Sequence, residues 1–320
     1  MRSYIIRRIL LMIPTVLFVT IIIFTTIRLV PGSIIDIMVA DYSAYGGTIS
    51  TVGKQAIEHD LGMDVPIYVQ YGRWLDQIVH GNLGTALWQQ APVVDSIEAR
   101  WPVTFELGLL ALIIAQLIAV PIGVYSALRQ NTWGDFVSRS FAILCIAVPS
   151  FWLATLVIVY PSIWWGYMPP LTLIRFTADP LGNLKMFIVP AIILGMGMSG
   201  GTMRMSRTMM LEVMRQDYVR TAWAKGLKER VVVTRHALKN ALIPIVTIIG
   251  QQMGVLVGGT VIIESIFNLP GMGLLTISAI QDRDYITVEA CLLLYAVVLV
   301  VINFITDLTY GYLDPRIHYT

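Results

Sequence analysis

Long apolar stretches, separated by short charged ones, dominate this chain of 320 residues. A helix needs roughly 20 consecutive apolar residues to cross a bilayer, and several runs come close to or reach that length. Together they predict six spans, at residues 9–27, 101–128, 136–160, 186–206, 240–264 and 287–308. We therefore expect an all-α, polytopic membrane protein with six transmembrane helices.

The segment after the first span, residues 31–100, is too polar to cross a membrane and too long for a simple turn. Apolar residues recur in it at spacings of three and four, which predicts an amphipathic helix beginning near Pro66, with Ile67, Tyr71, Trp74 and Ile78 on one face. A second helix should open at Pro92 and lead into the next span. This small extracytoplasmic insertion either caps the bundle or meets a substrate-delivering protein.

Charge distribution sets the orientation in the membrane. Residues 207–239, between the fourth and fifth spans, carry many more Lys and Arg than Asp and Glu, and such loops remain in the cytoplasm. Arg2, Arg7 and Arg8 precede the first span, so the N-terminus should also be cytoplasmic. An even number of spans returns the C-terminus to the same side.

Composition excludes several classes of protein. With 56% hydrophobic and 13% charged residues, the chain does not fit a soluble globular protein, and a net charge of +2 is too small to indicate nucleic acid binding. Cys145, Cys291 and the four scattered histidines give no spacing typical of a metal site. The sequence also lacks a GxxxxGK[ST] nucleotide-binding motif, so we expect no catalytic residue, metal or cofactor in this chain.

Charged residues near the ends of the predicted spans give little indication of function. Glu264 and Asp307 lie where side chains can reach the membrane interface, and this interpretation is favoured over a functional one. Asp282 and Asp284, in the segment QDRDY, are expected on a solvated external turn.

Many stretches resemble, in the same order, the permease subunits of ABC importers, in particular the first, B-type permease of the branch importing dipeptides, oligopeptides and nickel. They are LVPGS, LGMDVPIYVQYGRWL, HGNLGTALW, VTFELGLLALIIA, VPSFWLA, YVRTAWAKGL, RHALKNALIP, IFNLPGMGLLTISAIQDRDY and YLDPRI. The resemblance extends over essentially the whole chain. It implies the type I importer permease architecture, in the plasma membrane of a prokaryote.

In that family the basic segment forms a short coupling helix that docks in a groove of the ATPase subunit. The resemblance assigns this role to Asp217, Tyr218, Arg220, Thr221, Ala222, Lys225, Gly226 and Leu227. Arg220 and Thr221 stand where the wider superfamily has Glu and Ala, so the docking role is carried over without the carboxylate. Small residues at Ala222, Ala224 and Gly226 would let a partner approach closely. By charge alone, the segment could equally be a basic helix lying on anionic lipid.

The sequence predicts four parts: the N-terminal tail with the first helix (1–30), the insertion (31–100), a five-helix permease core (101–310) and a cytoplasmic tail (311–320). Small residues and prolines in the fourth and fifth spans predict a deformable gate or hinge, with Pro190, Gly195, Gly197, Gly200, Gly201 and Pro244 as candidates. Movement of the coupling helix would then switch the cavity between two permease subunits from facing in to facing out.

The resemblance implies a second, homologous permease subunit, two ATPase subunits that bind ATP and Mg, an extracytoplasmic solute-binding protein and the lipid bilayer. It favours di- or oligopeptides as cargo. Nickel or oligosaccharide import by the same architecture remains an alternative, and a stand-alone membrane carrier is a second one.

Overall fold

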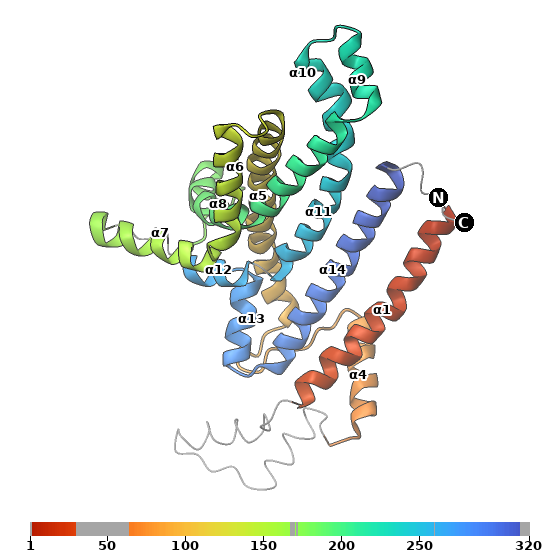
Figure 1. Ribbon diagram of the computed structural model, residues 1–320. Helices are drawn as coiled ribbons and strands as arrows, with labels where there is room; N and C mark the ends of the chain where they lie inside the picture. The colour runs from red at the N-terminus through yellow and green to blue at the C-terminus, as the bar shows by residue number, and fades with distance from the viewer. Residues whose placement is uncertain (1, 30–63, 167–169, 171, 259, 314–320) are drawn as a thin grey trace. The chain divides into compact units, whose positions relative to one another are not determined.

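The computed structural model describes residues 2–29, 64–166, 170, 172–258 and 260–313. The described part is helical, apart from turns and one isolated bridge pairing Thr85 with Pro92, so the all-α prediction is confirmed. Figure 1 shows the helices: α1 (Arg2–Leu29), α4 (Ile67–Val79), α5 (Val93–Leu128), α6 (Trp133–Ala147), α7 (Ser150–Trp165), α8 (Pro180–Met214), α9 (Asp217–Ala224), α10 (Glu229–Val231), the π-helix η1 (Val232–Ala237), α11 (Leu238–Gly258), α12 (Val261–Phe267), α13 (Met272–Gln281) and α14 (Tyr285–Leu313).

Five helical segments are long and apolar enough to cross a membrane: α1, α5, α8, the run from α10 through α11, and α14. The pairs α6 with α7 and α12 with α13 reach that length only as bent pairs, which allows up to seven spans. The six predicted spans fall within this range. Parts of the predicted insertion (31–63) and tail (314–320) lie outside the described residues.

The third predicted span, 136–160, is not one straight helix. It is divided between α6 and α7, whose axes are bent by 89° (Figure 1). Val148 has an extended backbone conformation, with φ −83° and ψ 117°, and Pro149 follows it. Proline disfavours the helical conformation in the residue before it and cannot donate a backbone hydrogen bond, so the helix ends at this point.

By its internal contacts the chain divides into two compact units. The first comprises residues 1–8, 100–275 and 298–320. Its core is built where α5, α7, α8 and α12 pack together, with Leu107, Ala154, Phe187 and Ile263 fully buried. Leu269, just after α12, completes this cluster. α8 therefore lies at the centre of the first unit, in contact with α6, α7 and α11.

The second unit comprises residues 9–99 and 276–297. Its amphipathic helix α4 begins at Ile67 directly after Pro66, and α5 begins directly after Pro92, as the sequence predicts. Asp284 departs from the prediction of a solvated turn, because it is buried and accepts hydrogen bonds from the Leu87 backbone and the Thr287 hydroxyl.

Glu264 also differs from the prediction that its side chain reaches the membrane interface. It is fully buried in the first unit, and its carboxylate accepts hydrogen bonds from the Thr104 hydroxyl (2.7 Å) and the Gly273 backbone (2.8 Å). The carboxylate lies at the start of α13, where the N–H groups of a helix have no intrahelical partner. Glu264 therefore joins the bent pair α12–α13 to α5.

Candidate functional site

The candidate site is the short helix α9 with the turns on either side of it. Eight residues are too few for a stable isolated helix, so α9 must be held by packing. Val219 and Ala222 face inward and form a buried cluster with Val232 of η1. The end of α8 and Leu227 cover this cluster. The apolar face of α9 is thus fixed to both flanking helices.

The C-terminal end of α9 has a defined cap. Gly226 N–H donates to the Trp223 carbonyl (2.9 Å) and Leu227 N–H donates to the Ala222 carbonyl (3.4 Å), which is the Schellman pattern. Gly226 has φ +75°, a conformation that strongly favours glycine, and a Cβ added there would meet no atom within 4 Å. The glycine is therefore required by backbone conformation and not by a lack of space.

The outer face of α9 is polar and aromatic. Of the predicted coupling residues, the structure exposes Asp217, Tyr218, Arg220, Thr221, Lys225 and Gly226. Trp223, which the sequence argument passed over, is also exposed (41%). Ala222 differs from expectation: it is buried against its own chain, so its small side chain allows α9 to pack and cannot face a partner.

One side-chain hydrogen bond ties the exposed face of α9 to the start of α11. Asn240 Nδ2 donates to the Tyr218 hydroxyl at 2.8 Å. Between the two lies the π-helix η1, a rare form that is frequent at functional sites. The Asp217–Arg220 ion pair (3.4 Å) is almost fully exposed and contributes little to stability.

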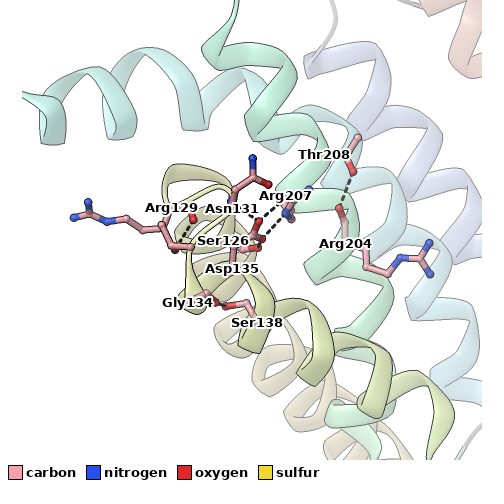
Figure 2. A network of polar contacts seen from close by, with 10 residues as sticks. Ser126, Arg129, Asn131, Gly134, Asp135, Ser138, Arg204, Arg207 and Thr208 are labelled. Carbon is pink, nitrogen blue, oxygen red and sulfur yellow. Dashed lines mark hydrogen bonds and ion pairs between the residues drawn. The ribbon is translucent and has the colours of Figure 1, made fainter.

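A buried ion pair fixes α8 shortly before α9 (Figure 2). Asp135 is completely buried, and its carboxylate accepts from Arg207 Nε (2.8 Å) and Arg207 Nη2 (2.9 Å). Ser126 Oγ and the Asn131 backbone N–H also donate to it. The contact joins the α5–α6 turn to α8. Sequence reasoning missed it, because the two partners are 72 residues apart in the sequence.

The predicted hinge residues lie within continuous helices. α8 runs without a break through Pro190 and all four glycines, and α11 runs through Pro244. Two of the glycines serve close packing, since a Cβ at Gly195 would lie 2.7 Å from the Ala111 carbonyl and one at Gly200 would lie 2.6 Å from the Ala142 carbonyl. Gly197 and Gly201 are exposed, with no atom near an added Cβ.

Comparison with known proteins agrees with this architecture. Residues 119–319 match the family described as binding-protein-dependent transport system inner membrane component, and residues 1–108 match its N-terminal family. A Brucella suis protein provisionally named a peptide transport system permease is 39% identical over 100% of both chains. The dipeptide transport system permease protein DppB of Escherichia coli K12 is 34% identical over 100% of this chain and 99% of its own.

A solved inward-facing structure of the MetNI methionine ABC transporter shares the fold. Its TM-score is 0.55 at 14% identity, with 68% of this chain and 96% of that chain covered. This likeness and the family match show a type I ABC importer permease architecture. The chain belongs to the family of binding-protein-dependent transport system inner membrane components, the multi-pass permease subunits of ABC transporters.

Proposed function

We propose that this permease subunit moves di- or oligopeptides, delivered by a solute-binding protein, into the cell, driven by ATP hydrolysis on separate subunits. The proposal rests on the full-length similarity to proteins named as peptide and dipeptide permeases, at 34–39% identity. The assembly would contain a homologous second permease and two ATPase subunits that bind ATP and Mg. The chain itself would catalyse no covalent chemistry.

The coupling role is supported by the two faces of α9, of which one is apolar and buried and the other is exposed. Its inner face shares one apolar cluster with the end of α8 and with η1, while its outer face exposes Tyr218, Trp223 and Lys225. A partner that pushes on the outer face would therefore move α9 together with the ends of α8 and η1. We propose that this outer face docks in a groove of the ATPase.

The orientation follows from the same proposal. The basic segment 207–239 would face the cytoplasm, where the ATPase subunits lie, and both termini would lie on that side. The Asp135–Arg207 pair would then hold the cytoplasmic ends of α5, α6 and α8 together, so that α9 is attached to a fixed platform.

Uptake of labelled di- to pentapeptides tests the function. Cells should express this chain with its neighbouring transport subunits, and a control strain should carry an ATPase-dead partner. We expect peptide accumulation that the control abolishes. Accumulation of nickel or an oligosaccharide instead would keep the architecture and overturn the cargo. Full uptake by this chain alone would indicate a stand-alone carrier and overturn the coupling role.

A further inference from the structure

α11 has two unlike faces. Most residues near the side of Gln251 are polar or small, namely Asn240, Pro244, Thr247, Gly254 and Gly258, with Ile248 and Val255 along one edge, whereas the opposite side carries Leu242, Ile245, Val246, Ile249 and Met253. This division follows from a helical turn of about 100° per residue. A helix surrounded by lipid gains nothing from such a division, because polar side chains within a membrane are costly.

Gln251 is exposed between two packed flanks. On one side, Gly250 is buried, and a Cβ there would contact the Thr306 side chain of α14. On the other side, Gln252 faces α8 and α5 through hydrogen bonds. The Gln251 side chain therefore points out of the first unit, from the C-terminal half of α11. Its surroundings must supply hydrogen bonds, which water or a polar ligand can do and lipid cannot.

The hydrogen bonds behind Gln251 have a fixed direction. The Met198 carbonyl can only accept, so Gln252 must present its NH2 group to it (2.8 Å) and turn its own oxygen toward Gln116. Gln116 then donates to that oxygen (2.9 Å). The Gln116 side-chain oxygen, in turn, has no hydrogen-bond donor among the described residues. This row of neutral amides thus ends in an unsatisfied acceptor between α5, α8 and α11.

We propose that the Gln251 face of α11 borders a water-filled path, and that its side-chain amides bind main-chain amide groups of the transported peptide. A carboxamide carries one C=O acceptor and N–H donors, which complement the N–H and C=O groups of a peptide bond. Residues 240–263 contain no charge, so this face neither selects nor repels charged peptide side chains. The ligand assignment rests on the proposed function, whereas the water-filled path does not.

Cysteine accessibility tests the path. Cys145 and Cys291 are replaced by Ala, and Gln251→Cys is compared with Ile249→Cys on the opposite face, in the complete transporter reconstituted in nanodiscs. A charged, membrane-impermeant methanethiosulfonate reagent reacts with thiolates, which form readily only in water. We expect Cys at 251 to react more than about tenfold faster than Cys at 249. Equal modification rates at the two positions would mean that lipid or another permease subunit covers residue 251, and would overturn the proposed water-filled path.

Peptide binding is tested separately on the same variants. A saturating dipeptide should slow modification at 251 and leave the rate at 249 unchanged, and Gln251→Leu should raise KM for uptake while Gln251→Asn raises it less. Rapid modification without peptide protection, and with an unchanged KM, would overturn the amide-binding assignment. If the parent transporter takes up no peptide, the proposed function fails. The ratio of the modification rates at residues 251 and 249 still decides whether the water-filled path exists.

Discussion

The helices on either side of the coupling segment, α8 and α11, are held in different ways. α8 passes unbroken through five glycines, packs closely at Gly195 and Gly200, and is anchored by the buried Asp135–Arg207 pair. The start of α11 follows a π-helix and packs on Met210 of α8 through buried Ala237 and Ala241, and its polar link to α9 is one exposed, neutral hydrogen bond. One side of the coupling segment is thus fixed by a buried ion pair and the other by apolar packing with an exposed hydrogen bond.

This contrast sharpens the coupling proposal. If α9 moves, the side without a buried ion pair is expected to yield first, and that side is η1 and the start of α11. We therefore expect α8 to move as a rigid rod and bending to concentrate in residues 232–237. The gate role predicted for Pro190, Gly195, Gly197, Gly200, Gly201 and Pro244 stays a prediction.

The largest effect is expected from removing the anchor of α8. Asp135→Ala leaves the Arg207 guanidinium without its carboxylate in a mostly buried position. Breaking one side of a buried ion pair costs about 3 to 5 kcal/mol, so the free energy of unfolding should fall by that amount. The measurement is denaturant unfolding of the purified chain in detergent.

Its control is the double variant Asp135→Ala, Arg207→Met. Because this variant carries no unpaired charge, it should recover part of the lost stability. A double variant no more stable than Asp135→Ala would show that the ion pair is not what anchors α8.

The next largest effect is expected at the close contacts of α8. In Gly200→Ala, the Cβ would lie 2.6 Å from both the Ala142 carbonyl and the Ile146 side chain, so α6 and α8 must separate. Overpacking of this kind costs about 1 to 3 kcal/mol. Gly201→Ala is the matched control, since its Cβ meets nothing within 4 Å. Thermal unfolding in detergent distinguishes them, and equal melting temperatures would contradict a packing role for Gly200.

Much of the fold follows from local patterns in the sequence. Apolar run length locates the helices that can cross a membrane, and Pro66 and Pro92 correctly mark the starts of α4 and α5. The break before Pro149 was also readable in principle, because proline restricts the residue before it. The prediction of one continuous third span at 136–160 gave too much weight to the length of the apolar run.

The interior polar contacts could not be predicted in the same way. Glu264 is buried because Thr104 and the start of α13 satisfy its carboxylate, and Asp135 is buried because Arg207 does. These partners are distant in the sequence, and charge patterns alone do not reveal such pairing. The inward direction of Ala222 likewise depends on Val232, which reaches α9 only through the fold.

A smaller effect on stability is expected at the cap of α9. Gly226→Val forces a β-branched residue into a left-handed conformation, at a cost of roughly 1 to 2 kcal/mol, confined to the turn. The chain should still insert and assemble, but ATP hydrolysis should support less uptake, because the Lys225–Leu227 turn no longer holds α9 in place. Gly226→Asn is the control, since Asn tolerates this conformation. The measurement is peptide uptake per ATP hydrolysed, and equal ratios in the two variants would contradict the role of the cap.

The smallest effect is expected from the bond between α9 and α11. Tyr218→Phe keeps the ring and removes only the hydroxyl that accepts from Asn240, a loss of about 0.5 to 1.5 kcal/mol at most, since the residues are exposed. Stability should barely change, while uptake per ATP falls modestly. Asn240→Ala should cause a similar fall, and the double variant should be no worse than either single one, because both remove the same contact. Additive losses would mean that movement reaches α11 through the apolar cluster around Val219 and not through this hydrogen bond.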